Sequence, residues 1–265
     1  MVAIDFRVQM LLSLFFACSI YHIVPAEVPQ EPLVIQVTEY SELASFGTVN
    51  IELFRKSNHF IPASIRLIDR EKTIYIDPLN VNPIEKADFI LITHSHSDHF
   101  SKRDIEQVAT EDTVIIGPKS VVSKLKGYNT RVVQPSKEYQ VNGLSFHTVP
   151  AYNISKHIVG IRPHPPQKGF VGYIIEIDGQ RIYHPGDTDV IPELLSLTDI
   201  DLAMIPIGSE NGLFTMSTPE AIGLINQIRP RAVLPIHYRI GEGYEDEFKR
   251  GIAEGIQVLS FGIEE

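Results

Sequence analysis

Residues 89–99 read FILITHSHSDH, and this stretch decides both the fold and the chemistry expected for the chain. Its first part, Phe89 to Thr93, is mainly apolar and of strand length, which predicts a strand buried on both faces. Residues 101–109 have the apolar spacing of a helix, and Ser101 can cap it. The polar residues between them therefore form a loop at the carboxyl end of a strand, where α/β proteins place their sites.

Three histidines and one aspartate within this loop form a set of side chains suited to metal ions. Neutral imidazoles bind zinc, iron or manganese, and a carboxylate adds negative charge. In an extended segment His94 and His96 share a face, because side chains alternate with a period of two, so both can reach one ion. Asp98 and His99 follow after the chain has turned and are expected to face a second ion. A surface histidine cluster is the alternative, which the buried strand and the helix around the loop disfavour.

Short apolar runs separated by turn signals continue along the rest of the chain. Strands are predicted over residues 34–37, 48–54, 64–68, 73–76, 89–93, 113–116, 131–133, 144–149, 171–177, 181–184, 202–206 and 232–236. Helices are predicted over residues 101–109 and 119–126, and from a capping box at Ser217-Thr218-Pro219-Glu220. Strands mixed with helices favour a layered α/β sandwich over an all-β fold.

Residues 94–99 (HSHSDH) resemble the HxHxDH signature of the metallo-β-lactamase superfamily. The resemblance covers the chain from Leu33 to its C-terminus, and residues 64–78 resemble the opening hairpin of the family and the loop after it. It implies an α/β fold, a four-layer αββα sandwich of two mixed β-sheets flanked by helices. Residues 206–221 are similar to a branch of predicted metal-dependent hydrolases related to ascorbate-phosphate lactonases.

The same resemblance implies two further metal ligands. The stretch YHPGDT resembles the motif whose aspartate, here Asp187, bridges two metals, and LPIHY resembles the last strand, whose histidine, here His237, binds the second metal. Asp187 is also expected from the residues alone, because it follows a strand and a Pro-Gly turn; Asp189 is the competing carboxylate. His184, in the same stretch, is interpreted as a structural residue.

One position departs from the family pattern. The family supplies a third histidine to the first metal after the strand predicted over residues 144–149, and Asn153 stands at the matching place. An amide oxygen is neutral and a weaker ligand than imidazole. His157 and His164 are the candidates to complete the site or to donate a proton, whereas His147 lies too far back along the strand.

The segment Asn153 to Gly169 is rich in Pro, His, Lys and Gly and has no clear period. A loop of this length inside a domain is usually functional or mobile. Its cations Lys156, Arg162 and Lys168 are candidates to cover a phosphate or carboxylate, and a solvated basic loop is the alternative.

The reaction that these features imply is metal-assisted hydrolysis, in which a metal-bound hydroxide attacks an electrophilic carbonyl or phosphorus. Two divalent ions are expected, with zinc preferred and manganese or iron as alternatives, and Asp98 is the catalytic residue that also holds the hydroxide. Asp98, Asp187 and the hydroxide leave the site slightly positive, which suits an anionic small molecule. The expected bond is an ester, lactone or phosphodiester. The alternative is a non-hydrolytic metal-binding protein of the same fold, with a redox or sensory role.

Composition narrows the class of partner. The 265 residues carry 23 basic and 33 acidic side chains, a net charge of −10, which argues against duplex nucleic acid as a partner. Hydrophobic residues make up 43% and charged residues 21%, as in ordinary globular proteins. The single cysteine, Cys18, excludes an intrachain disulfide and a zinc ribbon.

The N-terminus is predicted to be a separate segment. Residues 8–20 (VQMLLSLFFACSI) are shorter than the roughly 20 residues of a transmembrane helix and suit the apolar region of a signal peptide. We predict an export signal or membrane anchor over 1–26, a Pro-rich linker over 27–32 and a metallo-hydrolase domain over 33–265. Export or membrane attachment is thus favoured over the cytoplasm. Lipidation at Cys18 and a buried N-terminal helix are the alternatives.

Overall fold

The computed structural model describes residues 36–37, 41–54, 59–69, 72–81, 85–208 and 213–259. The predicted export segment and linker, residues 1–32, lie outside the described residues. Within the described ranges, no helix combines the length and the apolar character needed to cross a bilayer.

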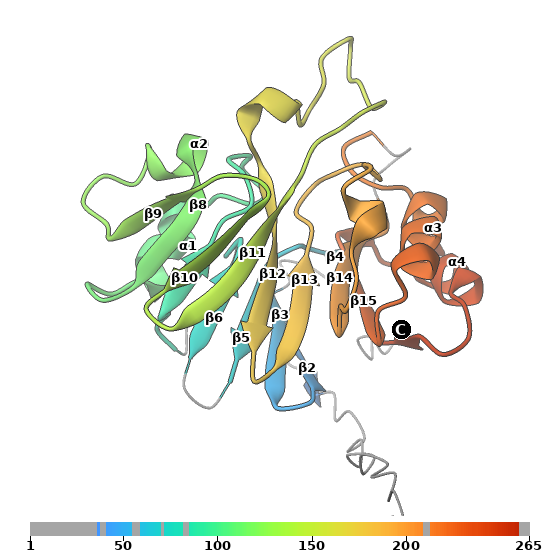
Figure 1. Cartoon of the computed structure of the whole chain (residues 1–265), viewed down its shortest axis with the longest axis horizontal. Helices are drawn as coiled ribbons and strands as arrows, with labels where there is room; N and C mark the ends of the chain where they lie inside the picture. Colours follow the sequence, from blue (N-terminus) through green and yellow to red (C-terminus); the bar gives the residue numbers. More distant parts are fainter. Residues whose placement is uncertain are drawn as a thin grey trace, which may run out of the picture. The chain divides into compact units, whose positions relative to one another are not determined.

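The first half of the domain forms an eight-stranded mixed sheet in the order β1-β2-β3-β5-β6-β7-β8-β9 (Figure 1). Pairing is antiparallel from β1 to β6 and parallel from β6 to β9. Helix α1 connects β7 to β8 and helix α2 connects β8 to β9, as parallel pairing requires a crossover. The bounds are β1 Gln36–Val37, β2 Ser41–Phe46, β3 Val49–Phe54, β5 Ile65–Ile68, β6 Thr73–Ile76, β7 Phe89–Leu91, α1 Lys102–Val108, β8 Val114–Pro118, α2 Lys119–Val122 and β9 Thr130–Val133.

The second half forms a seven-stranded mixed sheet in the order β10-β11-β12-β13-β14-β15-β17. Pairing is antiparallel from β10 to β13 and parallel from β13 to β17. A short pair, β4 and β16, joins segments from the two halves. The bounds are β4 Phe60–Ile61, β10 Lys137–Val141, β11 Leu144–Pro150, η1 Pro166–Lys168, β12 Val171–Ile177, β13 Gln180–His184, η2 Leu194–Ser196, β14 Leu202–Pro206, α3 Thr218–Ile228, β15 Ala232–Ile236, β16 Tyr238–Arg239, α4 Tyr244–Gly251 and β17 Gln257–Val258.

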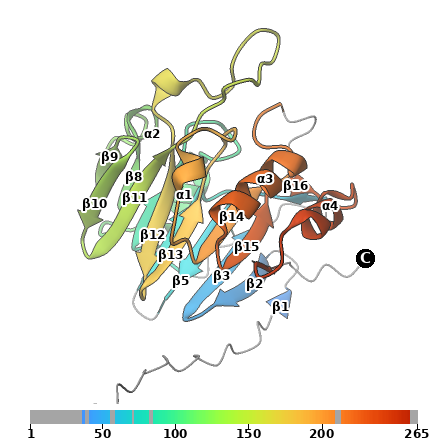
Figure 2. The ribbon, with the colours of Figure 1, turned by 45° about the vertical axis from the view of Figure 1, so that its right-hand side comes forward.

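The two sheets pack face to face, and helices cover their outer faces (Figure 2). Strand β6 has three consecutive large, buried side chains, residues 74–76, because both faces of the sheet are covered. Ile74 and Ile76 join the core shared with the second sheet, whereas Tyr75 between them joins the core under α1 and α2. Helices α3 and α4 cover the second sheet beside β14 and β15 (Figures 1 and 2). The predicted four-layer αββα sandwich is confirmed.

The local predictions differ from the structure where polar residues form regular elements. Helix α2 ends at Val122 instead of residue 126, because Lys124 and Leu125 donate to carbonyls three residues back, in a turn before Gly127. Strand β10 and helix α4 were not predicted, since β10 is an edge strand without a fully buried residue and α4 buries only one. The predicted capping box of α3 is present, with the Ser217 amide donating to Glu220 Oε2 at 2.8 Å.

Candidate metal centre

The predicted metal-binding loop lies between β7 and α1 and is anchored by Thr93. The Thr93 amide donates to Asp77 Oδ1 at 2.7 Å, and the Thr93 carbonyl accepts from the amide of Val171, the first residue of β12, at 3.1 Å. Strand β7 belongs to the first sheet and β12 to the second. The loop is therefore fastened to both sheets at its start.

The first ligand group consists of His94, His96 and His164. Each offers one ring nitrogen, and the nitrogens lie within 4.8 Å of one another. His94 and His164 are buried and His96 is half-buried. His94 and His96 lie together as the alternation of an extended segment predicted, and His164 joins them from the loop between β11 and β12.

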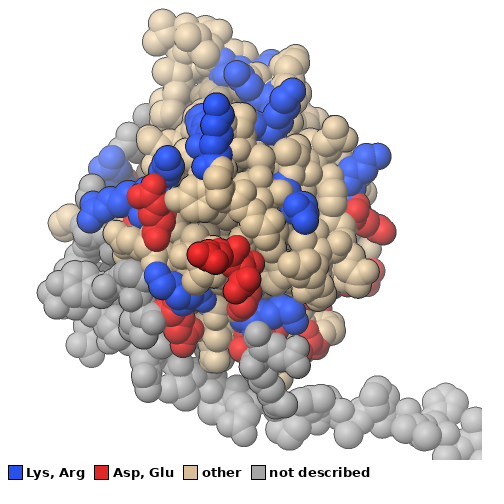
Figure 3. Space-filling view, turned by 90° about the vertical axis from the view of Figure 1, so that its left-hand side faces the viewer, with Lys and Arg blue, Asp and Glu red and all other residues tan. Residues whose placement is uncertain are grey.

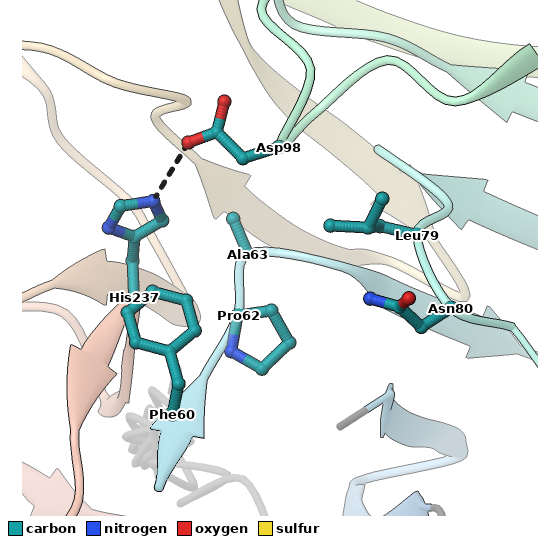
Figure 4. A pocket seen from close by; sticks show the side chains of 7 residues that line it. All are labelled: Phe60, Pro62, Ala63, Leu79, Asn80, Asp98 and His237. Carbon is teal, nitrogen blue, oxygen red and sulfur yellow. Dashed lines mark ion pairs between the residues drawn. The ribbon is translucent and has the colours of Figure 1, made fainter. Parts of the chain in front are cut away.

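The second ligand group consists of Asp98, His99, Asp187 and His237, whose ligand atoms also lie within 4.8 Å of one another. His99 Nε2 is 3.3 Å from Asp187 Oδ1, and His237 Nε2 is 3.9 Å from Asp98 Oδ2 (Figure 4). The Asp98 side chain is 55% exposed, whereas His99 and Asp187 are buried. All four residues were singled out from the sequence, and their roles as ligands stay predictions.

Asp187 lies between the two groups and offers one oxygen to each. Its Oδ2 is 3.6 Å from Nε2 of His164 in the first group, and its Oδ1 is 3.3 Å from Nε2 of His99 in the second. Oδ1 is also 3.9 Å from Nε2 of His237. This is the placement that a carboxylate bridging two ions requires.

The turn that presents Asp187 is held by His184. Its Nδ1 accepts from the Gly186 amide at 3.2 Å, so Nε2 carries the proton and donates to the Ala63 carbonyl at 2.9 Å. Gly186 has a positive φ of 64°, and a Cβ there would lie 2.9 Å from Thr93 Cβ. Only glycine fits without displacing the turn, and His184 has the structural role expected of it.

Asp77 orients one histidine of each group, and it was not predicted as a site residue. It is buried after β6 with φ of 47° and accepts from the Thr93 hydroxyl at 2.6 Å and from His99 Nδ1 at 2.8 Å. Because that hydroxyl donates to Asp77, its oxygen is free to accept from His94 Nδ1 at 2.9 Å. Both rings therefore present Nε2 to the centre, as outer hydrogen-bond partners of metal ligands make them do. Asp77 also lies close enough to the two rings to be counted as a ligand, but these hydrogen bonds make it a supporting group.

The structure places His164, and not Asn153, beside His94 and His96. Asn153 Oδ1 accepts from both the backbone amide of His164, at 2.9 Å, and its Nδ1, at 3.0 Å. The Asn153 amide in turn donates to the His164 carbonyl at 2.8 Å, so the two segments pair at this point. The expectation that Asn153 takes the position of the family's third histidine is therefore corrected: its oxygen is used to hold the imidazole that takes that position.

Two other interpretations of the loop change with the structure. His157 is exposed, lies in neither ligand group, and has Nδ1 2.9 Å from the Ser155 carbonyl. Lys156 is buried and forms ion pairs with Asp189 at 3.0 Å and Glu220 at 2.7 Å, so it does not offer a free charge to a substrate. Asp189, the competing carboxylate, lies in this network and not in either ligand group.

The network around Asp189 holds the loop that carries His164. Asp189 Oδ2 accepts from the backbone amides of Ile154 at 2.7 Å and Ser155 at 3.1 Å, and its Oδ1 accepts from Asn153 Nδ2 at 2.8 Å. Burial opposes ionisation of Asp189, but these hydrogen bonds and the one from Lys156 outweigh it and lower the pKa of Asp189. Asn153, which orients His164, is thus itself oriented by an ionised carboxylate.

Protonation differs between the two groups. Burial, with His99 nearby, lowers the pKa of His94 well below its usual range, and burial lowers the pKa of His164 to about 4, so both rings are neutral at pH 7. Burial also acts on His99, but the carboxylates of Asp187 and Asp77 outweigh it and raise its pKa. Burial opposes ionisation of Asp98, yet the nearby imidazoles of His237 and His99 lower its pKa to about 2.

The buried nitrogen and oxygen atoms of the centre that have no hydrogen-bond partner fit a metal ion. Among the described residues, Nε2 of His94, His99 and His164 and Oδ1 of Asp187 are buried and have no hydrogen-bond partner. Buried polar atoms are rarely left unpaired, because each costs about 1–3 kcal/mol. Imidazole nitrogens and carboxylate oxygens converging in this way are the ligands of zinc and similar divalent ions.

Comparison with known proteins agrees with this centre. A model of the beta-lactamase superfamily domain matches residues 59–237, the span that runs from β4 to the last histidine of the second group. The chain belongs to the beta-lactamase superfamily. The match extends over all seven residues of the two ligand groups.

Relatives within the superfamily carry related descriptions. A UPF0173 metal-dependent hydrolase of Thermococcus onnurineus is 32% identical over 209 residues, which cover 71% of this chain and 88% of that protein. A UPF0173 metal-dependent hydrolase of Thermus thermophilus is 31% identical over 188 residues, covering 66% of this chain and 80% of that protein. A metal-dependent hydrolase of this superfamily is therefore supported for the chain.

Solved structures agree on the fold. A protein of Parabacteroides distasonis assigned as a metal-dependent hydrolase superposes with a TM-score of 0.72 at 30% identity, covering 85% of this chain and 100% of that one. The metallo-beta-lactamase fold protein YhfI of Bacillus subtilis superposes with a TM-score of 0.60 at 12% identity, covering 81% and 97%. The second likeness shows the shared fold alone.

Proposed function

We propose that this superfamily member hydrolyses an ester, lactone or phosphodiester bond of a small anionic molecule with two divalent ions. Zinc is the first candidate metal, and manganese and iron are the alternatives. The observation that carries the proposal is that the two ligand groups share Asp187. Its Oδ1 faces the second group and its Oδ2 faces the first. The two oxygens lie beside histidines of different groups, which is the arrangement expected of a carboxylate shared by two ions.

The first ion would be held by His94, His96 and His164, and the second by Asp98, His99 and His237, with Asp187 shared. Divalent ions in such a site act as Lewis acids and lower the pKa of bound water. Thr93 and Asp77 keep two of the rings in the tautomer that leaves Nε2 free. Asn153 does the same for His164 through its Nδ1.

Asp98 is the catalytic residue of the proposal. It is ionised at neutral pH, with a pKa of about 2, and its side chain is 55% exposed at the edge of the centre. An ionised carboxylate there accepts a hydrogen bond from the attacking water and orients it toward the bond to be cleaved. In the net reaction the hydroxyl of water adds to the acyl carbon or the phosphorus, the ester bond breaks, and the leaving oxygen takes the proton.

The charge distribution supports an anionic substrate. Two divalent ions would bring four positive charges against three on Asp77, Asp98 and Asp187, so the centre would keep one positive charge for hydroxide or an anionic ligand. On the face shown in Figure 3, basic side chains gather toward the upper end, the end at which the Asn153–Gly169 loop projects in Figure 1. Acidic side chains are interspersed below them, and the net charge of −10 still disfavours duplex nucleic acid.

Metal analysis and a hydrolase screen test this function together. Elemental analysis of the purified protein is expected to find about two divalent ions per chain, as two complete ligand groups predict. p-Nitrophenyl acetate, a γ-lactone and bis(p-nitrophenyl) phosphate represent the three bond types. Activity on at least one of them is expected to disappear with a chelator and to return with added zinc, manganese or iron.

A matched pair of variants assigns the activity to the centre. Asp98→Ala is expected to abolish turnover and keep the fold, whereas Asp112→Ala, which changes an exposed aspartate between α1 and β8, leaves turnover unchanged. A protein that binds both ions and hydrolyses none of the three probes would favour the non-hydrolytic alternative.

A further inference from the structure

Two cavities of different chemistry meet at Asp98. The larger, of about 490 Å³, lies on the side of the first ligand group and is called here the Arg162 cavity. The smaller, of about 240 Å³, lies on the side of His237 and is called the Phe60 cavity (Figure 4). Asp98 lines both, so a molecule whose reacting bond lies at Asp98 has room to extend to either side.

Beyond the residues of the metal centre that line it, His96, Asp98 and Asp187, the Arg162 cavity is mainly apolar with one cation. Ile158, Ile161 and Phe214 line it, and Ile161 is 72% and Phe214 44% exposed. Large apolar side chains exposed beside a metal centre mark a binding surface for an apolar group. The Ile158–Ile161 bridge forms a small hairpin that presents this surface.

Arg162 is the cation that lines this cavity; Lys156 is held in ion pairs, and Lys168 is exposed and does not line it. Nη2 of Arg162 donates to the Ile154 carbonyl at 3.1 Å, which fixes the guanidinium, while Nε is buried with no hydrogen-bond partner among the described residues. No carboxylate of the described residues lies within ion-pair distance of it, in contrast to Lys156. A fixed guanidinium with no ion-pair partner among the described residues, beside apolar side chains of the same cavity, is suited to a carboxylate or phosphate of a ligand.

The Phe60 cavity is nearly apolar and about half as large. Pro62, Ala63 and Leu79 form its walls, and Asn80 adds one amide (Figure 4). Phe60 packs edge-on against the His237 ring at 5.3 Å between centroids, so the cavity reaches the second ligand group. Among the described residues that line it there is no Lys or Arg, and a small uncharged group fits this chemistry.

We propose that the substrate is an open-chain ester or diester with unequal groups on the two sides of the scissile bond. An apolar chain that ends in an anionic group lies in the Arg162 cavity, and a small uncharged group lies in the Phe60 cavity. This inference rests on the proposed hydrolase function and names the substrate class of the same centre.

The experiment compares eight-carbon esters with and without a terminal carboxylate on the metal-loaded protein. p-Nitrophenyl monosuberate and p-nitrophenyl octanoate place the difference on the acyl side, and the acetate esters of 8-hydroxyoctanoate and octanol place it on the alcohol side. In at least one pair, kcat/KM is expected to favour the anionic ester about tenfold, the preference that a charge-assisted hydrogen bond provides.

Variants assign each preference to its cavity. Arg162→Met is expected to reduce the anionic-to-neutral ratio to about one, and Arg162→Lys to restore part of it, because the charge remains. Leu79→Phe is expected to lower the rate of a naphthyl monosuberate relative to the methyl monosuberate about tenfold, as overpacking does. Leu195→Ser, which changes a 46% exposed apolar residue outside both cavities, is the control and leaves both ratios unchanged.

The outcomes separate this inference from the proposed function. Hydrolysis of esters without any preference for the anionic member in either pair, or a preference that survives Arg162→Met, overturns the inference and leaves the hydrolase function intact. If no ester is cleaved, calorimetric binding of the same pairs decides: weaker binding of the anionic esters by Arg162→Met supports the inference, and equal binding overturns it. Thermal unfolding of each variant excludes a loss of fold.

Discussion

The two ligand groups are delivered by the chain in different ways. The members of the second ligand group follow the ends of strands β7, β13 and β15, at short distances along the sequence. The first ligand group takes two members from the same loop after β7. Its third member, His164, comes from within a long loop between β11 and β12. The first ligand group is made of neutral imidazoles, whereas the second ligand group contains two ionised carboxylates.

This difference shows how much support each kind of ligand needs. A ligand at a strand end is placed by the ladder of the sheet, and Asp187 needs only the His184 and Gly186 turn. His164 has no adjacent strand to place it, so Asn153 and the Asp189 network hold it by side-chain hydrogen bonds. The first group is therefore sensitive to changes outside the ligands, and the second to changes of charge.

The largest effect on metal binding is expected from Asp187→Asn, because this residue belongs to both groups. The amide keeps the size of the side chain but removes the charge and one acceptor oxygen. Both ions should bind more weakly, and kcat/KM on the best probe should fall by about a hundredfold or more, as with other lost electrostatic groups. Asp112→Asn is the matched control, and a variant that retains two ions and normal turnover would remove Asp187 from the shared position.

Changes to a single ligand should separate the groups. His164→Ala should release the ion held by His94 and His96, and Asp98→Ala should release the ion held by His99 and His237. Each variant is expected to keep about one ion per chain, because the other group retains most of its ligands. Elemental analysis after gel filtration measures this, and loss of both ions in either variant would show that the groups do not bind independently.

The pH dependence of stability should report on the first group in the metal-free protein. Burial lowers the pKa of His164 to about 4, below its ordinary value of 6.5. The unfolded chain then binds more protons between these values, so the free energy of unfolding rises from pH 4 to 6.5, by at most about 3 kcal/mol for this histidine.

Urea denaturation of chelator-treated protein, compared with His164→Gln, measures that contribution. The variant should show a flatter rise over the same window, while any contribution from His99, whose raised pKa acts above pH 6.5, is common to both proteins. Equal slopes would mean that the His164 imidazole is not buried as a neutral ring.

The smallest effect is expected from Asn153→Ala, which removes a supporting residue and no ligand. The His164 ring loses one of the two acceptors beside its Nδ1 and keeps the Phe214 carbonyl, which lies 3.1 Å away. The affinity of the first ion should therefore fall about tenfold, the lower end of the loss known for outer partners of metal-binding histidines. Competition with a chelator measures this for each ion separately. Asn129→Ala, at an exposed asparagine before β9, is the control, and an equal loss at both groups would contradict the assignment.

Residues at strand ends could be predicted from the sequence, and residues placed by long-range contacts could not. The run FILIT predicted β7, and the polar residues after it supplied four members of the two groups. His164 was only one of two loop histidines, because no periodic pattern fixes how residues 153–169 fold back onto Asn153. Asp77 resembled any aspartate at the end of a strand, since its three hydrogen bonds come from residues at least 16 positions away.

The connection between the two sheets at Thr93 also affects the lifetime of the folded protein. Residues 94–99 project from the first sheet, whereas His164, Asp187 and His237 project from segments of the second. Any ion that binds both sets does so only when the sheets are docked, so its binding free energy opposes their separation. By mass action, a cell rich in that metal would hold the sandwich closed, and one starved of it would expose the chain to unfolding and proteolysis.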